Sequence, residues 1–275
     1  MAASSHAAPA FVCLAGHPLR WRLLTELARS DLRVRELVTL VGEPQSLVSY
    51  HLRLLREGGL LTTTRSSFDG RDLYYHLSLE RCADALADTG TALNPALRLI
   101  PPPGAAGEAP AQEAPAGAVP GAAAWPSAAA MSVLFVCTGN SARSPIAEAL
   151  LRRYTAGRIE AASAGSRPKP RIHPHAVRVL RDAYGLDAGR QPPRHVNTLT
   201  GRRFDYLISL CDKAREVCPE LVDHARRIHW SIPDPARAGD DQRGYPAFAR
   251  TAVDIDTRIR YLLPVLATEK MEVQP

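Results

Sequence analysis

Residues 133–144 read Val-Leu-Phe-Val-Cys-Thr-Gly-Asn-Ser-Ala-Arg-Ser and decide the fold of the second half of this 275-residue chain. The apolar run Val133–Val136 predicts a buried parallel strand that ends at Cys137. The segment 144–151 has the composition of a helix, with Pro145 in the first turn, where a missing N–H costs nothing. A loop between a buried strand and a helix N-terminus directs backbone N–H groups and the helix dipole at one point. We therefore expect it to bind an anion.

The residue types in this loop suit nucleophilic chemistry on an oxyanion. A helix N-terminus and a neighbouring arginine stabilise a thiolate, the nucleophilic form of a cysteine such as Cys137. Arg143 offers a planar fork for two oxygens of a tetrahedral oxyanion, and the Ser144 hydroxyl can donate to the thiolate. The other predicted anion-binding residues are Thr138, Gly139, Asn140, Ser141 and Ala142. A strand-end cysteine followed by an arginine can also arise by chance, but the strand, the Gly-Asn pair and the helix around them count against that interpretation.

This loop resembles that of the low-molecular-weight protein tyrosine phosphatase superfamily, whose members include the thioredoxin-coupled arsenate reductases. The resemblance extends over roughly residues 131–267. The pattern of the chain independently predicts an α/β domain with a four-stranded parallel sheet and helices on both faces. Its apolar strands are expected at residues 133–136, 159–163, 205–210 and 227–232.

Three chemically capable side chains stand at the carboxyl ends of these strands, where open parallel sheets bind their ligands. Cys137 ends the first strand, Cys211 ends the third and Asp234 follows the fourth, so we expect them to converge. Cys218 comes seven residues after Cys211, about 10 Å along an intact helix. A disulfide needs Cα atoms within about 7 Å, so pairing these two requires the segment between them to unwind. The alternative is one structural and one incidental cysteine.

Two stretches favour the reductase branch of the superfamily. The Cys-x6-Cys spacing after the third strand resembles the thioredoxin-coupled arsenate reductases, and tyrosine phosphatases do not need it. Residues 228–236, Ile-His-Trp-Ser-Ile-Pro-Asp-Pro-Ala, also resemble theirs. The phosphatase branch usually has a tyrosine after Asp-Pro, where this chain has Ala236.

The resemblance implies a thiol relay. Cys137 attacks arsenate held by the loop and Arg143, and Asp234 donates a proton to the departing oxygen. Cys211 then attacks Cys137 and releases arsenite, after which Cys218 attacks Cys211. An external thiol reductant, either thioredoxin, a mycoredoxin-like protein or a small thiol, resets the last disulfide, and no tightly bound cofactor is implied. Alternatively, Asp234 caps a helix.

The reductases often hold a potassium ion (K+) beside the loop. Three residues fall where its ligands would lie, namely Asn140, Glu148 and Ser163. The stretch 195–198 lacks the aspartate that some members contribute, which counts against the ion.

Residues 10–90 predict a winged helix-turn-helix. Helices are expected at 18–28, 34–41 and 44–55, and an Asp-Gly turn separates strands at 60–64 and 73–77. The helix after the turn carries short polar groups for base edges and an arginine for phosphates. Its candidate DNA-binding residues are Gln45, Ser46, Ser49, Tyr50, His51 and Arg53. A helical protein–protein module is the alternative.

Residues 44–60, PQSLVSYHLRLLREGGL, resemble the ArsR-type metalloregulatory repressors. That resemblance implies a homodimer, formed through this domain, that reads a two-fold operator. Arsenite-sensing members often carry two cysteines in the preceding helix, but residues 31–37, DLRVREL, have arginines there, and arginine cannot ligate As(III). The remaining candidate ligands are Cys13 and Cys82, which the packing of terminal helices in such a dimer would bring to the interface. The alternative is that both are small buried residues.

Composition supports two domains on a tether. Residues 91–130 are rich in Pro, Ala and Gly and cannot bury enough apolar surface to fold, so they predict a linker between domains at 10–90 and 131–275. The second domain carries 23 basic and 16 acidic residues, a positive excess that suits an anionic substrate. No apolar run approaches 18 residues and residues 1–9 lack a signal-peptide pattern, so we expect no membrane partner. The five cysteines show no dense spacing, which favours a location in the reducing cytoplasm.

The sequence therefore predicts a bifunctional arsenic-resistance protein, an arsenate reductase fused to an ArsR-type repressor. The expected partners are operator DNA, a second copy of the chain, a thioredoxin-like reductant, and arsenate with its product arsenite. Two alternatives stay open: a low-molecular-weight protein tyrosine phosphatase fused to a regulator, and an oxyanion sensor without turnover.

Overall fold

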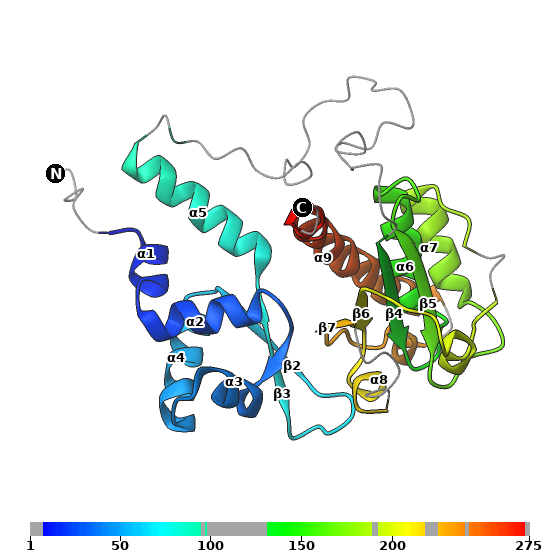
Figure 1. The fold of residues 1–275 in the computed structure, drawn as a ribbon, viewed down its shortest axis with the longest axis horizontal. Helices are drawn as coiled ribbons and strands as arrows, with labels where there is room; N and C mark the ends of the chain where they lie inside the picture. Colours follow the sequence, from blue (N-terminus) through cyan, green and yellow to red (C-terminus); the bar gives the residue numbers. More distant parts are fainter. Residues whose placement is uncertain are drawn as a thin grey trace. The chain divides into compact units, whose positions relative to one another are not determined.

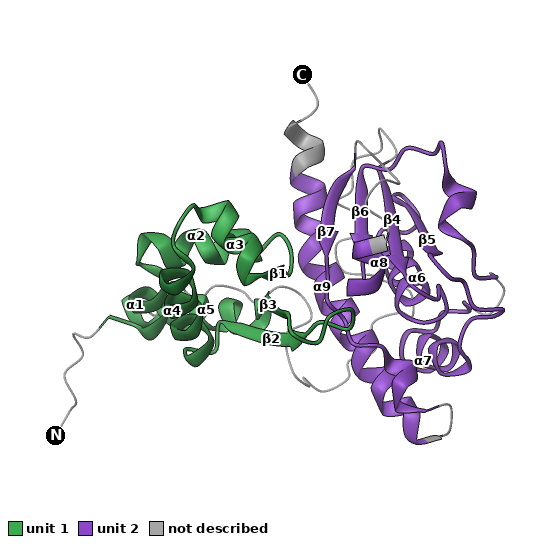
Figure 2. Ribbon diagram, turned by 90° about the horizontal axis from the view of Figure 1, so that it is seen from below, with its two compact units in different colours: residues 1–115 green, residues 116–275 purple. Residues whose placement is uncertain are grey.

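The computed structural model describes residues 8–94, 97, 131–188, 192–217, 225–239 and 242–272. The chain divides into two compact units, residues 1–115 and 116–275, each with its own hydrophobic core (Figure 2). Residues 101–130 of the predicted linker lie outside the described ranges. Within those ranges, no helix is both long enough and apolar enough to cross a membrane.

The first unit is a small helical domain with a three-stranded antiparallel sheet in the order β1-β3-β2 (Figure 2). Its elements are α1 (Ala10–Ala15), α2 (Pro18–Leu27), β1 (Leu32–Arg33), α3 (Val34–Val41), α4 (Gln45–Glu57), β2 (Leu61–Arg65), β3 (Leu73–Leu77) and α5 (Leu79–Leu93). The winged helix-turn-helix order predicted from the sequence is confirmed. Helix α5 continues three residues into the segment predicted as linker.

Local chemistry sets the boundaries of the helix-turn-helix. Helix α3 ends at Gly42, whose backbone is left-handed with φ 69°. At its other end Arg33 and Glu36 form a capping box, and Arg33 also pairs with Asp72 at 3.2 Å, which ties α3 to the strand hairpin. The bounds predicted for α3 and β3 agree with the structure to the residue.

The second unit is an α/β domain whose four parallel strands lie in the order β5-β4-β6-β7 (Figure 1). Its elements are β4 (Ser132–Cys137), α6 (Arg143–Tyr154), β5 (Glu160–Gly165), α7 (Pro174–Tyr184), η2 (Val196–Leu199), β6 (Tyr206–Ser209), α8 (Asp212–Val217), β7 (Arg226–His229), η3 (Pro235–Ala238), η4 (Gln242–Gly244) and α9 (Tyr245–Glu272). The predicted four-stranded parallel sheet is confirmed.

The central strand fixes the position of the loop that follows it. All six residues of β4 are buried, as expected for a strand paired on both sides in a parallel sheet. The last strand, β7, ends at His229, three residues earlier than the sequence predicts. The Ile232 N–H donates to the Trp230 carbonyl at 2.9 Å, so the chain leaves the strand direction in a tight turn.

Candidate active site

The loop after β4 is held from outside through its carbonyl groups. Four of these carbonyl groups accept hydrogen bonds from backbone N–H groups of the segment 166–173. The donor and acceptor pairs are Ser166 to Cys137 (3.3 Å), Arg167 to Thr138 (2.8 Å), Lys169 to Gly139 (2.9 Å) and His173 to Ser141 (2.8 Å). A peptide whose carbonyl is engaged on one side presents its N–H toward the other. These contacts leave the N–H groups of the loop able to bind an anion ahead of helix α6.

The loop lies so close to strand β5 that only glycine fits at residue 165. A Cβ added to Gly165 would stand 2.7 Å from the Thr138 carbonyl oxygen and 2.9 Å from the Asn140 nitrogen. Asn140 itself has φ 44°, the left-handed conformation that asparagine tolerates better than most residues. Sequence reasoning included Asn140 among the loop residues but missed Gly165, whose only signal is its place at the end of the second strand.

Cys137 is buried beside a hydroxyl that can stabilise its thiolate. Its Sγ lies 3.0 Å from Ser144 Oγ. The Asn140 amide donates to Ser144 Oγ at 3.0 Å, so the hydrogen of the Ser144 hydroxyl is left for the sulfur or for the Ala164 carbonyl, 3.5 Å away.

Arg143 is buried at the start of α6 and is held at two points. One guanidinium nitrogen donates to the Ile232 carbonyl at 2.8 Å, and another lies 3.4 Å from Asp234 Oδ2. Its Nε has no hydrogen-bond partner among the described residues. Burial lowers the pKa of Arg143, but the neighbouring Cys211, Cys137 and Asp234 together raise it above its ordinary value. The arginine is thus cationic and keeps a donor available for an oxyanion.

Cys211 and Asp234 both reach this loop from other strands. The Cys211 Sγ lies 3.3 Å from Thr138 Oγ1. Burial raises the pKa of Cys211 and Cys137 adds to this, while Arg143 and Thr138 oppose it. Asp234 serves two purposes, because its Oδ2 faces Arg143 while its Oδ1 accepts the Ala236 N–H at 3.4 Å and caps the short helix η3. The helix-cap interpretation and the contact with the loop arginine therefore both hold.

The partner expected for Cys211 is not placed. Cys218 lies outside the described residues, which end at Val217 in this part of the chain. The helix α8, Asp212–Val217, spans the whole interval between the two cysteines.

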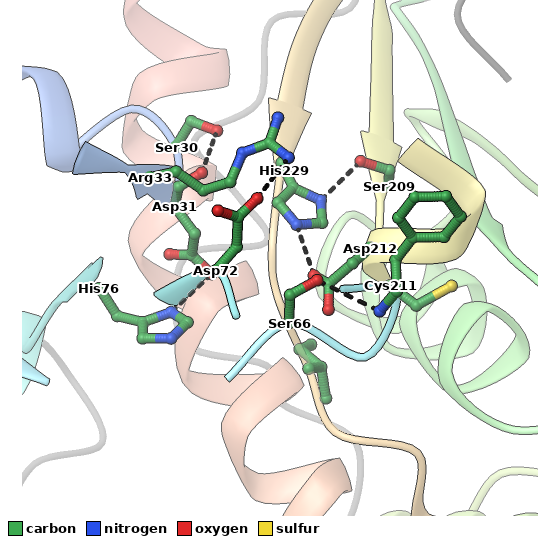
Figure 3. A network of polar contacts seen from close by, with 12 residues as sticks. Ser30, Asp31, Arg33, Ser66, Asp72, His76, Ser209, Cys211, Asp212 and His229 are labelled. Atoms are coloured by element: carbon green, nitrogen blue, oxygen red, sulfur yellow. Dashed lines mark hydrogen bonds and ion pairs between the residues drawn. The ribbon is translucent and has the colours of Figure 1, made fainter. Parts of the chain in front are cut away.

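A polar network that the sequence did not suggest joins β6, β7 and the start of α8 (Figure 3). The His229 Nδ1 lies 2.8 Å from Ser209 Oγ, and its Nε2 lies 3.0 Å from Asp212 Oδ1. Asp212 is the residue after Cys211, so this network fixes the backbone that carries the second thiol.

The first unit has a buried ion pair of its own, in which Asp31 Oδ2 lies 2.8 Å from His76 Nδ1. Both side chains are drawn in Figure 3.

In the first unit, helix α4 exposes most of the residues predicted to meet DNA. Gln45, Ser46 and Ser49 are exposed, as are Tyr50 and Arg53, whose guanidinium lies 5.6 Å from the Tyr50 ring. His51 was wrongly included in this set. It is only 5% exposed and packs against His17, with ring centroids 4.4 Å apart, because its position in α4 faces the core.

The two cysteines predicted as As(III) ligands lie on neighbouring helices. Cys13 is exposed on α1, whereas Cys82 is half-buried on α5, which packs against α1. Burial raises the pKa of Cys82 to about 11, which disfavours the thiolate that metal binding requires. Among the described residues, no three His, Cys, Asp or Glu side chains gather as a metal site.

Comparison with known proteins identifies both parts of the chain. Residues 132–272, just over half of the sequence, match the family described as "Low molecular weight phosphotyrosine protein phosphatase". The chain belongs to that family. Residues 17–63 match "Bacterial regulatory protein, arsR family". The phosphatase-family domain thus carries the loop, and the arsR-family region carries helix α4.

The relatives of the phosphatase-family domain include proteins named arsenate reductase. That of Halalkalibacterium halodurans is 32% identical over 129 residues, 46% of this chain and 91% of the relative. That of Brevibacillus brevis is 33% identical over 129 residues, 47% of this chain and 91% of the relative. A solved structure titled "An arsenate reductase in the phosphate binding state" has 27% identity and a TM-score of 0.43, and the match covers 49% of this chain and 97% of the other.

The residues expected to hold potassium beside the loop of this phosphatase-family domain do not fit that ion. Asn140 donates to Ser163 Oγ at 2.9 Å, and Ser163 donates to Glu148, so the three side chains do lie together. However, the Glu148 carboxylate is already paired with Arg152 at 2.7 Å and with Arg194 at 3.4 Å. Two guanidinium groups supply the positive charge that a monovalent cation would bring.

Proposed function

We propose that this protein is an arsenic-resistance fusion, in which the phosphatase-family domain reduces arsenate to arsenite and the arsR-family domain binds operator DNA. The observation that carries the reductase assignment is the Cys211 sulfur, 3.3 Å from the hydroxyl of loop residue Thr138. Phosphoryl transfer needs one nucleophilic thiol, whereas reduction of arsenic by two electrons needs a second thiol near the first. The arsenate reductases among the relatives support the same assignment.

The first step forms a sulfur–arsenic bond. The Cys137 thiolate attacks arsenate held by the loop N–H groups and by Arg143. Asp234 in its protonated form gives a proton to the departing oxygen, which leaves as water. Its contact with Arg143, at 3.4 Å, supports this placement at the bound anion.

The second step transfers the electrons. The Cys211 thiolate attacks the Cys137 sulfur, a disulfide forms, and the sulfur–arsenic bond breaks with its electron pair staying on arsenic. Arsenic passes from As(V) to As(III), and arsenite leaves. Because burial raises the pKa of Cys211, the hydroxyl of Thr138 and the charge of Arg143 are the groups that help it to ionise.

Cys218 completes the cycle in this proposal. Its thiolate attacks Cys211, frees Cys137 and leaves a Cys211–Cys218 disulfide, which an external dithiol of the thioredoxin type reduces by exchange. Helix α8 must open for the two sulfurs to meet, because residues seven apart on a helix are about 10 Å apart. The Ser209–His229–Asp212 network anchors the first residue of α8, so the opening is expected toward its C-terminal end.

A substitution of Cys211 tests the reductase assignment. Cys211→Ser should abolish thioredoxin-dependent arsenate reduction and leave hydrolysis of p-nitrophenyl phosphate intact, since the loop and Asp234 are unchanged. Cys13→Ser, on the other unit, is the matched control and should reduce arsenate at the wild-type rate. If the wild-type chain reduces no arsenate with any thiol system but hydrolyses phosphotyrosine, it is a phosphatase. Oxyanion binding without either reaction would identify a sensor.

The exposed polar face of α4 supports the second half of the proposal. We propose that Gln45, Ser46 and Ser49 read base edges and that Arg53 contacts phosphate, in a dimer on a two-fold site. A DNA sequence selected from a random pool by the full chain should lose affinity about uniformly with Arg53→Ala, whereas Gln45→Ala should change the preferred sequence. Selection of no sequence at all would leave the protein–protein alternative.

Coupling between the halves is a separate proposal. The predicted domains, 10–90 and 131–275, are joined through a segment rich in Pro, Ala and Gly, which suits proximity rather than rigid communication. Arsenite made by one domain would then release DNA from the other through Cys13 and Cys82. Operator affinity should fall with arsenite in the wild type and not in Cys13→Ser or Cys82→Ser. An unchanged wild-type affinity would remove arsenite as the inducer.

A further inference from the structure

Arg194 contacts both the loop at residues 137–144, called the anion loop from here on, and the buried carboxylate of Glu148. Its backbone N–H donates to Asn140 Oδ1 at 2.8 Å. Its guanidinium lies 3.4 Å from Glu148 Oε1. One residue thus joins the left-handed turn of the loop to the first helix after it, from a segment 46 residues away from Glu148.

The charge on Glu148 is already balanced. Its side chain is only 5% exposed, and a buried carboxylate requires a counter-charge. Arg152, one turn further along α6, pairs with the same carboxylate oxygen at 2.7 Å, and Arg194 adds a second guanidinium. A potassium ion among Asn140, Glu148 and Ser163 would bring a further positive charge next to two others, which like-charge repulsion disfavours.

A chain of hydrogen bonds leads from this cluster to the nucleophile. Asn140 accepts from Arg194 through its carbonyl oxygen and donates through its amide nitrogen to Ser163 and Ser144. All of its polar atoms are therefore committed, and the orientation of its side chain is fixed. Ser144 lies 3.0 Å from the Cys137 sulfur. The contacts that fix the position of Arg194 therefore also fix the Ser144 hydroxyl beside the Cys137 sulfur.

We propose that Arg194 is a built-in cation that takes the place of potassium in this chain and keeps the anion loop in its binding conformation. It is a positioning residue, since it acts on the anion and on Cys137 through Asn140 and Ser144. This inference deepens the proposed function and rests on it for the identity of the substrate. Its consequence for binding is general, because any tetrahedral oxyanion in the loop depends on the same conformation.

Phosphate binding by the full chain tests the proposal. Titration calorimetry with inorganic phosphate and thermal unfolding are carried out in potassium chloride and in choline chloride at equal ionic strength. The wild type should give the same Kd and Tm in both salts. Arg194→Asp should lose phosphate affinity by about tenfold or more in choline. It should recover affinity and Tm in potassium, because the new carboxylate, Glu148 and Ser163 then offer oxygen ligands to a cation.

Two further variants separate charge from general damage. Arg194→Lys keeps the positive charge and should bind phosphate with the same Kd in both salts. Arg202→Met removes an exposed arginine that pairs with Glu160 on the same domain, and it should match the wild type throughout. If Arg194→Asp does not fold, the proposal is tested by comparing the phosphate Kd and the Tm of the wild type and of Arg194→Lys in potassium and in choline.

Potassium that tightens phosphate binding or raises the Tm of the wild type would overturn the proposal. So would wild-type affinity of Arg194→Asp in choline. None of these measurements uses arsenate turnover. A chain that reduces no arsenate but shows this salt pattern would refute the reductase assignment and leave the role of Arg194 standing.

Discussion

The Thr138 hydroxyl lies 3.3 Å from the Cys211 sulfur, although 73 residues separate the two in the sequence. Thr138 belongs to the loop after β4, and Cys211 follows strand β6 by two residues, so this contact connects the predicted anion site to the proposed second thiol. Burial raises the pKa of Cys211, and the Thr138 hydroxyl acts in the opposite direction. In the proposed mechanism, the rate at which Cys211 attacks should therefore depend on pH and on this hydroxyl.

Replacing Thr138 by valine should slow the second thiol step near neutral pH. The thiolate fraction of Cys211 rises with pH, and loss of the hydroxyl raises its pKa further. Each unit of that shift costs about tenfold in thiolate below the pKa. Single-turnover formation of the Cys137–Cys211 disulfide should be slower in Thr138→Val at pH 7 and approach the wild-type rate in strongly alkaline buffer. The control is Thr200→Val, an exposed threonine in the same domain. A pH profile identical to the wild type would show that the hydroxyl does not act on Cys211.

Replacing Asp234 by asparagine should affect turnover far more than binding. Asparagine can still accept the Ala236 N–H and cap η3, but it cannot deliver a proton to the leaving oxygen. The kcat for arsenate reduction should fall about 100-fold or more, as is usual when a general acid is lost. Phosphate affinity should stay the same or increase, since a negative charge 3.4 Å from Arg143 is removed. An unchanged kcat would leave Asp234 only its capping role.

The two cysteines of the first unit should differ strongly in reactivity. Burial raises the pKa of Cys82 to about 11, so about one thiol in a thousand is ionised at pH 8. Cys13 is exposed and should be alkylated by iodoacetamide well before Cys82, as peptide mapping by mass spectrometry can show. The protonated form of Cys82 is favoured in the folded state, so its contribution to stability is present at neutral pH and is lost as pH rises toward 11. Equal alkylation rates would mean that Cys82 is far more accessible than its position implies.

The stability of the first unit should fall in mild acid because of His51. Its burial, with His17 and Arg20 nearby, lowers the pKa of His51, so the folded state resists protonation while the unfolded state does not. The sign follows from linkage: stability is fully present above about pH 6.5 and declines as the pH falls below it. The Tm of the first unit should drop between pH 7 and pH 5 in the wild type and drop less in His51→Gln. If the Tm did not change between pH 7 and pH 5 in either the wild type or His51→Gln, His51 would not be the cause of acid sensitivity.

Much of the loop after β4 was predictable because its parts are adjacent in the chain. The apolar run before Cys137, the Gly-Asn turn and the helix from Arg143 are local features, and β4 and α6 have the expected places. The outward face of α4 was predictable for the same reason. His51 was assigned wrongly since a histidine is compatible with either face, and only its packing against His17 shows which one it takes.

The end of the fourth strand was predicted three residues too late, because hydrophobic residues continue past His229 through Trp230 and Ile232. Apolar composition alone does not distinguish a strand from a buried turn. The turn at Trp230 brings the Ile232 carbonyl to Arg143, a contact across 89 residues that no local pattern encodes.

The sequence by itself determined that this chain has a strand–loop–helix unit with a cysteine at the start of the loop, two further candidate groups near strand ends, and a winged helix-turn-helix before it. These follow from periodicity and short-range backbone chemistry, which depend on neighbouring residues. Only the tertiary structure decided that Gly165 permits the loop to approach β5, that Thr138 meets Cys211, and that Arg194 neutralises Glu148. Each of these is a contact between distant segments whose distance and charge balance are set by how the strands and helices pack, and packing is a property of the whole domain.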